Sequence, residues 1–244
     1  VGAEILATFI LVHGACHGGW CWEKVQPILE SHGHKVCAPD LPGLGKDHTP
    51  PANVTLPDNV EKISRLLDKM EEPVVLVGHA LGGVTISQTA EARRRRIKAL
   101  VYVCGLMPPS GKASREMTAG DPEILFRRSR EVSPDGLTYT FARAQLPALF
   151  YQDVSYEDRY RAMERLRPQP ISISKTPLTL TEDRYGSVAR WYIECTLDNA
   201  VRIGRQRAMV KALPCKVITM ECGHSPFYSN PEELVEHLEA IAAS

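Results

Sequence analysis

Residues Val74 to Gly83, VVLVGHALGG, carry the most informative pattern in the sequence. The apolar run Val74–Val77 has the composition of a buried strand, and the glycines after it are typical of a sharp turn into a helix. This is the spacing of the G-x-S-x-G pattern, in which such a turn exposes a serine above the edge of a sheet. The central residue here is Ala80, which has no hydroxyl. A phosphate-binding loop is disfavoured, because neither G-x-G-x-x-G nor G-x-x-x-x-G-K occurs at this turn.

Short apolar runs recur on both sides of this segment and alternate with stretches of helical spacing. They predict strands at Thr8–Val12, Lys35–Ala38, Val74–Val77, Ile97–Val103, Trp191–Thr196 and Lys216–Met220. Such alternation predicts an α/β fold, with a mostly parallel sheet and helices on both of its faces.

The helices between these strands are predicted from apolar spacing and from capping residues. The first would carry on one face Trp22, Val25 and Leu29. Thr55 and Asp58 predict a capping box for the next, whose inward side chains would be Val60, Ile63, Leu67 and Met70. Another helix should start near Ala80. Asn230 is expected to cap the last helix, which would bury Leu234, Leu238 and Ile241.

Residues 108–181 interrupt the alternation. This stretch has helical patches and few strand signals, and it lies between two predicted core strands. We interpret it as an inserted helical cap over the carboxyl ends of the strands, and residues 1–107 and 182–244 as the core. The basic run Arg93–Arg96 is interpreted as the solvated end of a helix rather than as an anion site.

The overall charge of the chain is balanced. Lysine plus arginine and aspartate plus glutamate number 29 each, which gives no reason to expect nucleic acid or an acidic membrane as a partner. No apolar run approaches the roughly 20 residues that a membrane helix needs. A monomer or a homodimer is expected.

Cysteine usage favours the cytoplasm. The seven cysteines are an odd number, contain no C-x-x-C pair, and lie mostly in or beside predicted strands. This favours buried, reduced thiols over a disulfide framework or a zinc site, so no metal is expected. Residues Val1 to Thr8 lack a basic segment followed by a long apolar run, so no secretory signal is expected there.

A nucleophile of the G-x-S-x-G type needs a base and an orienting carboxylate, which follow it in the order acid, then histidine. His224 lies in a glycine-flanked loop between the last predicted strand and the last helix. Asp198 follows the strand Trp191–Thr196 and would lie at its carboxyl end. Asp183 is the rival acid, but it precedes that strand and belongs at the opposite edge.

Acyl transfer also needs hydrogen-bond donors for a developing oxyanion. One is expected from the amide after the nucleophile position, here Leu81. The other is expected from the loop after the first strand, where Gly14 would let the chain turn so that the amide of Ala15 faces the site.

The chain resembles the methylesterase and hydroxynitrile-lyase branch of the α/β-hydrolase superfamily. The similar stretches are HGACHGGWCW (His13–Trp22), VVLVGHALGG (Val74–Gly83), DRYGSVARWYIECTLDNAV (Asp183–Val201) and GHSPF (Gly223–Phe227). The resemblance implies Asp198 as the acid, His224 as the base, and the amides of Ala15 and Leu81 as the oxyanion donors, with no cofactor.

Ala80 differs from the pattern of this family, which has serine at the corresponding position. We interpret it as a serine-to-alanine substitution, and a natural chain without a nucleophile is the alternative. The resemblance to the lyase branch would imply acid–base chemistry with a threonine and a lysine. This chain has Gly14 and Ser225 at those positions, so hydrolysis is favoured over lyase chemistry.

With serine at position 80, the expected reaction is acyl-enzyme hydrolysis of an ester-type bond in a small, mainly apolar or aromatic substrate. Some bacterial relatives resemble carbamate hydrolases, so a carbamate ester is also an expected substrate. The candidate substrate-binding residues are Gly14, Leu106, Phe150 and Phe227. The second functional class is a small-molecule-binding protein without catalysis.

Overall fold

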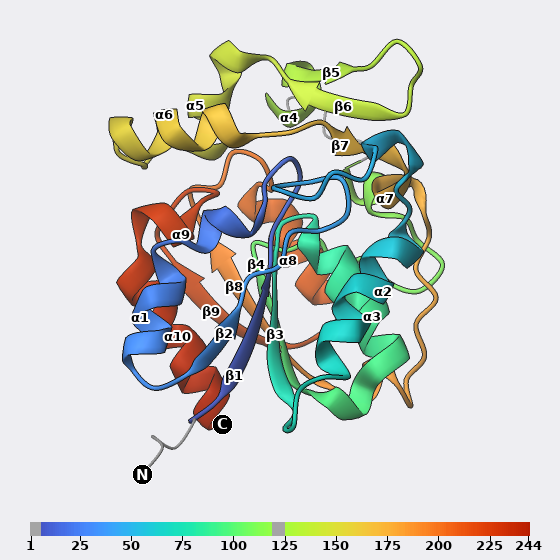
Figure 1. Cartoon of the computed structure of the whole chain (residues 1–244), viewed down its shortest axis with the longest axis vertical. Coiled ribbons are helices and arrows are strands. Elements are labelled where there is room, and N and C mark those ends of the chain that lie inside the picture. Colours follow the sequence, from blue (N-terminus) through green and yellow to red (C-terminus); the bar gives the residue numbers. More distant parts are fainter. Residues whose placement is uncertain (1–5, 119–124) are drawn as a thin grey trace.

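The computed structural model describes residues 6–118 and 125–244, and its main sheet has the predicted α/β architecture (Figure 1). Six parallel strands lie in the order β2-β1-β3-β4-β8-β9. Their bounds are Thr8–Val12 (β1), Lys35–Cys37 (β2), Val74–His79 (β3), Ile97–Val103 (β4), Ala189–Cys195 (β8) and Lys216–Met220 (β9). Neighbouring strands in this sheet are separated in sequence by helices, which is the signature of crossover connections.

Helices cover both faces of the sheet (Figure 1). On one face α1 packs against α10, and on the other α2 packs against α3. Alternate residues of β1 enter different cores: Phe9 and Leu11 join one cluster, and Ile10 and Val12 join the other. The core helices are α1 (Val25–Ser31), α2 (Leu56–Leu67), α3 (Gly82–Arg93), α8 (Ile203–Ala212), α9 (Pro226–Ser229) and α10 (Pro231–Ala243). The two-sided burial explains why β3 has no polar side chain before His79.

Several predicted helix details need correction. The first helix begins only at Val25, after a separate 3-10 turn at Gly19–Trp22. The capping box of Thr55 and Asp58 is confirmed, but α2 ends before Met70. Asn230 makes no capping hydrogen bond; its side-chain amide donates to Glu233 instead.

The segment between β4 and β8 is not purely helical, and this part of the prediction is wrong. Three of its strands form an antiparallel sheet, β5 (Arg130–Val132), β6 (Thr138–Phe141) and β7 (Gln169–Pro170). Its helices are α4 (Leu125–Ser129), α5 (Leu146–Phe150), α6 (Tyr156–Arg165) and α7 (Ile171–Lys175). Figure 1 shows this small sheet and α6 lying across one end of the main sheet. The alternating burial of β6, with Tyr139 and Phe141 inward, is the two-residue period that the sequence analysis overlooked.

Short 3-10 turns complete the fold, at Gly19–Trp22, Pro51–Asn53, Arg94–Arg96, Ser114–Thr118, Arg143–Gln145 and Tyr185–Ser187. The run Arg93–Arg96 begins at the last residue of α3, and Arg93 pairs there with Asp68. All seven cysteines are free thiols. Among the described helices, none is both long enough and apolar enough to cross a bilayer.

Candidate active site

The turn after β3 holds Ala80 in a strained backbone conformation. Its φ is +46°, in the left-handed region that a residue with a side chain rarely adopts. Two backbone hydrogen bonds fix it: the Ala80 amide donates to the carbonyl of Val103 at 3.1 Å, and its carbonyl accepts from the amide of Leu106 at 2.8 Å. A Cβ on Gly82 would lie 2.7 Å from the carbonyl oxygen of His13, which explains the glycine at that position. The sharp turn predicted from the sequence is confirmed.

Asp198 and His224 meet beside this turn. Nδ1 of His224 lies 2.8 Å from Oδ2 of Asp198, and both side chains are buried. The other carboxylate oxygen of Asp198 accepts from the amides of Ala200 and Val201 at 2.7 and 2.8 Å. A carboxylate only accepts hydrogen bonds when ionised, so Nδ1 of His224 carries the proton and Nε2 is left with its lone pair. Asp183, the rival acid, lies exposed near the basic run Arg93–Arg96, away from His224.

The amides of Ala15 and Leu81 are available as donors. Both residues line one cavity together with Ala80 and His224. In the described part of the chain, neither amide donates a hydrogen bond to another residue. A Cβ on Gly14 would lie 2.8 Å from Nδ1 of His79 and 3.0 Å from the Cβ of Ala80, so the lack of a side chain lets this loop approach the turn of Ala80 closely.

Two buried histidines hold the loop that carries Ala15. His13 accepts from the amide of Leu41 through Nε2 at 3.0 Å and donates from Nδ1 to the carbonyl of Gly14 at 2.9 Å. His17 donates from Nδ1 to the carbonyl of Ala15 at 2.7 Å and accepts from the hydroxyl of Tyr151 at 2.8 Å. Burial lowers the pKa of His13 to about 4 and that of His17 to about 3, so both are neutral and keep these roles near neutral pH.

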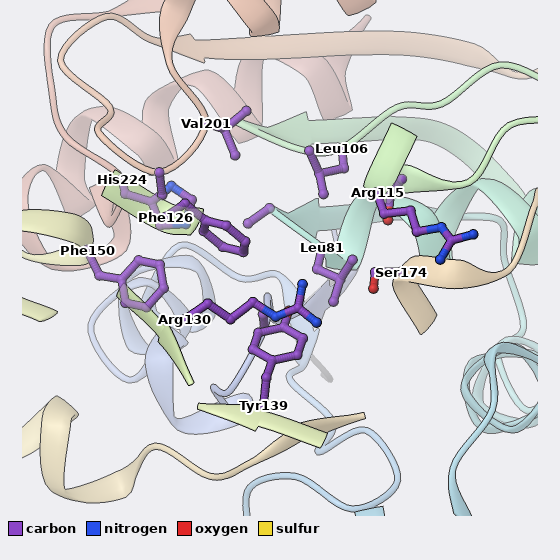
Figure 2. Close-up of a pocket in the computed structure, with 14 residues that line it drawn as sticks. Leu81, Leu106, Arg115, Phe126, Arg130, Tyr139, Phe150, Ser174, Val201 and His224 are labelled. Carbon is purple, nitrogen blue, oxygen red and sulfur yellow. The ribbon is translucent and has the colours of Figure 1, made fainter. Parts of the chain in front are cut away.

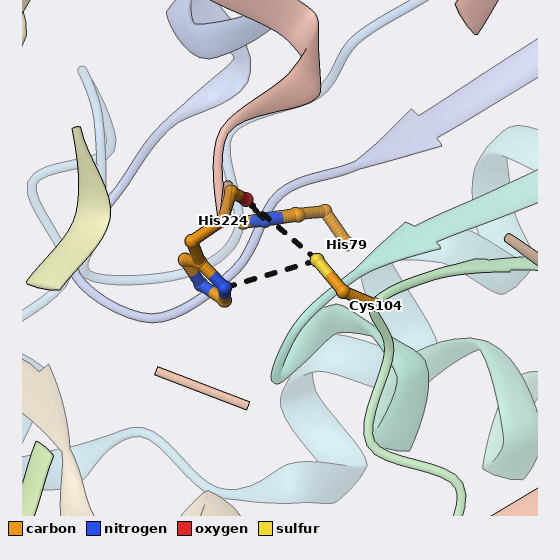
Figure 3. A group of neighbouring side chains, drawn as sticks. All are labelled: His79, Cys104 and His224. Carbon is orange, nitrogen blue, oxygen red and sulfur yellow. Dashed lines mark hydrogen bonds between the residues drawn. The ribbon is translucent and has the colours of Figure 1, made fainter. Parts of the chain in front are cut away.

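His224 also belongs to a second group of titratable side chains, together with His79 and Cys104 (Figure 3). Their candidate ligand atoms lie within 4.8 Å of one another. However, Nε2 of His79 donates to the carbonyl of His224 at 2.8 Å, and burial raises the pKa of the Cys104 thiol to about 12. A metal would have to displace the proton that His224 donates to Asp198. Because Nδ1 of His224 is bonded to Asp198 and the Cys104 thiol keeps its proton, the group fits packing behind the loop of His224 better than metal binding.

The cavity in front of these groups holds about 560 Å³ of empty space, part of it open to solvent. Of the predicted pocket residues, Leu106 and Phe150 line it, whereas Gly14 and Phe227 do not. Phe227 packs instead against the rings of His79 and Trp22. The lining residues are Ala15, Ala80, Leu81, Leu106, Ser114, Arg115, Phe126, Arg130, Tyr139, Phe150, Ser174, Ala200, Val201 and His224 (Figure 2).

The cap contributes residues that sequence reasoning missed. Arg130, at the start of β5, extends over the ring of Tyr139 on β6, with its guanidinium carbon 4.2 Å from the ring centre (Figure 2). Phe126 of α4 and Ser174 of α7 also face the cavity. Alternation in Thr138–Phe141 could have placed Tyr139 on an inward face, but no sequence pattern distinguishes Arg130 from the neighbouring arginines.

Comparisons with known proteins identify the family of the chain. The sequence profile described as "Alpha/beta hydrolase family" matches residues 9–237. Methyl jasmonate esterase 1 from Vitis vinifera is 34% identical over 254 residues, with 97% of each chain covered.

Two solved structures share the whole architecture. A pyrethroid hydrolase from Sphingobium faniae JZ-2 superposes with a TM-score of 0.90 at 27% identity, covering 98% of both chains. Polyneuridine aldehyde esterase superposes with a TM-score of 0.88 at 28% identity, covering 97% of this chain and 99% of that one. The similarity therefore includes both the core and the cap.

Proposed function

The chain belongs to the α/β hydrolase family and is of its esterase type, and on that premise we propose that it is the scaffold of a serine hydrolase whose nucleophile is missing at Ala80. The reaction is the hydrolysis of an ester-type bond, a carboxylic ester or a carbamate ester, through an acyl-enzyme. The observation that carries the proposal is the convergence on one cavity of Ala80, of His224, which is bonded to Asp198, and of the amides of Ala15 and Leu81, which donate to no described residue.

With serine at position 80, Nε2 of His224 takes the proton of the hydroxyl while Asp198 holds the imidazole and stabilises its charged form. The serine oxygen attacks the carbonyl carbon, and the amides of Ala15 and Leu81 stabilise the negative charge on the carbonyl oxygen. His224 then gives its proton to the leaving alcohol. Water, activated by the same imidazole, releases the acid or carbamic acid and restores the serine.

The substrate is a small molecule with apolar or aromatic parts, because Leu106, Phe126, Phe150 and Val201 make up much of the cavity wall. The names of the relatives, methyl jasmonate esterase and pyrethroid hydrolase, support the carboxylic ester. The carbamate ester rests on the bacterial resemblance described above. Seven free thiols support the cytoplasm as the compartment, and a monomer or homodimer remains the expected assembly.

The first prediction restores the nucleophile. Ala80→Ser should raise the hydrolysis of p-nitrophenyl acetate by at least about a thousandfold, since losing the nucleophile costs another serine hydrolase on the order of 10⁶ in turnover. Burst kinetics would reveal the acyl-enzyme. Testing methyl esters, aryl amides and methyl carbamates on the same protein gives the bond class. Ala80→Gly is the matched control, and equal rates for Ala80→Ser and Ala80→Gly would reject the assignment.

A binding protein without catalysis is the second candidate, and Ala80 itself favours it. Such a protein would keep the affinity of the cavity for its ligand when serine is introduced, without gaining turnover. The lyase reaction has less support, because the residue after His224 is Ser225, which is buried and uncharged.

A further inference from the structure

We propose that Arg130 binds an anionic oxygen of the substrate, so that the preferred substrates are aromatic esters or carbamate esters that also carry a carboxylate. This inference rests on the proposed hydrolase function and adds the substrate class. It makes Arg130 a specificity-determining residue contributed by the cap.

The charge of the cavity wall is the first observation. Among the described residues that line the cavity, two are arginines, Arg115 and Arg130, and none is aspartate or glutamate. The whole chain has equal numbers of basic and acidic residues, so the described wall of the cavity is more basic than the chain as a whole. A pocket with apolar walls and a net positive charge attracts anions.

The environment of Arg130 is the second observation. Its Nε atom is buried and has no hydrogen-bond acceptor in residues 6–118 or 125–244. No carboxylate of those residues pairs with its guanidinium. Its contact is the ring of Tyr139, whose pKa burial raises, so that the phenol stays neutral and supplies no countercharge. A partly buried cation without a counterion is costly, and a bound anion removes that cost.

The direction of the side chain is the third observation. Figure 2 shows Arg130 running across the cavity from the side of Phe150, with its guanidinium above Tyr139 and turned toward Leu81. One molecule can therefore present its ester carbonyl to the amides of Ala15 and Leu81 and a second oxygen-bearing group to Arg130. A guanidinium fork matches the two oxygens of a carboxylate. An aromatic spacer fits the ring-rich wall formed by Phe126, Tyr139 and Phe150.

Arg115 does not carry the same argument. It is exposed at the cavity wall, on the turn Ser114–Thr118, and it has interactions of its own. The competing explanation is a structural role, in which Arg130 stabilises the cap by stacking on Tyr139. That role would affect stability and every substrate equally, whereas anion recognition affects only the charged substrate.

The test uses two esters of nearly equal shape in the Ala80→Ser background. The 4-(methoxycarbonyl)benzoate ion carries a carboxylate, and methyl 4-nitrobenzoate carries a neutral nitro group in its place. The measured quantity is the ratio of kcat/KM for the charged ester to kcat/KM for the neutral ester. Comparing this ratio between variants cancels the different intrinsic reactivity of the two esters.

Arg130→Met should lower the ratio by about tenfold or more, the usual effect of losing a hydrogen bond between charged groups. Arg130→Lys keeps the charge without the fork and should give an intermediate ratio. Arg128→Met removes the same charge from an exposed position two residues away and should change the ratio by less than about twofold, because solvent screens it. A ratio that is the same in Arg130→Met and Arg128→Met would overturn the inference.

Binding to the chain with Ala80 separates the two proposals, because it needs no nucleophile. Calorimetry with both esters should show the same dependence on Arg130. If both esters are hydrolysed and Arg130→Met changes neither the ratio nor the binding, anion recognition is rejected and the hydrolase proposal stands. Binding that depends on Arg130, without hydrolysis by Ala80→Ser, keeps the recognition and rejects the hydrolase.

Discussion

The imidazole of His224 is held by side chains from four parts of the chain. Asp198 accepts its Nδ1 proton, and the ring of Phe150 stacks on it at 5.2 Å between centroids. His79 holds the carbonyl of the same residue, and the thiol of Cys104 lies 3.8 Å from Nδ1. Such contacts leave Nε2 as the group free to exchange protons in the cavity. At the scale of single residues, the site is therefore preorganised even though Ala80 has no hydroxyl.

The role of the carboxylate is testable with a matched pair of aspartates. In the Ala80→Ser background, Asp198→Asn should lower kcat by roughly 10⁴, because the amide favours the wrong tautomer of His224. Asp183→Asn, at an exposed position, should leave kcat nearly unchanged. A larger loss from Asp183→Asn would place the acid before β8 and contradict the geometry.

The support of the oxyanion loop is testable at Tyr151. Tyr151→Phe, again in the Ala80→Ser background, removes the hydroxyl that fixes His17 and through it the carbonyl of Ala15. We expect kcat to fall by about tenfold with little change in KM, since a misplaced donor weakens transition-state binding selectively. Tyr160→Phe, at an exposed site on α6, is the control. A change in KM alone would assign Tyr151 to substrate binding.

At the scale of elements, the bounds of β1, β4 and β9 agree with the predicted ranges. For β1 and β4 the reason is an apolar run that is buried in a parallel sheet. The order of Ala80, Asp198 and His224 along the chain was also readable, since each follows a strand. The cap was less predictable. Its strands β5 and β7 have three and two residues, too few to show a period, so Arg130 could not be placed in the cavity from sequence.

The close contact between α3 and the loop after β4 gives an element-scale prediction. A Cβ on Gly83 would lie 2.4 Å from the carbonyl oxygen of Leu106, so Gly83→Ala should destabilise the fold by about 1–3 kcal/mol. Gly204→Ala, in α8, meets no atom within 4 Å and should be neutral or stabilising by up to about 1 kcal/mol. Urea unfolding of both variants measures the difference. Equal stabilities would mean that α3 shifts freely against Leu106.

At the scale of the whole molecule, three histidines are buried in the neutral form: His13, His17 and His79. Burial lowers the pKa of each, to about 4 for His13 and about 3 for His17. The unfolded chain binds protons near pH 6.5, so between about pH 6.5 and 4 it holds more protons than the folded chain. Protonation therefore favours unfolding as the pH falls through this window.

We expect the free energy of unfolding to fall by about 1 kcal/mol per pH unit for each buried histidine in that window. Denaturant unfolding between pH 7 and 4 measures the slope. His17→Gln should make the slope shallower by the contribution of one buried histidine, about 1 kcal/mol per pH unit. His48→Gln, at an exposed position, should leave the slope unchanged. A slope that His17→Gln does not alter would mean that His17 takes up its proton in the folded chain.

The hydroxyl of Tyr151 belongs to the cap, whereas the imidazole of His17 that it contacts belongs to the core. A movement of the cap away from the core would break this contact and remove one support of the Ala15 carbonyl. A single hydroxyl therefore couples the position of the cap to the position of the loop that carries Ala15.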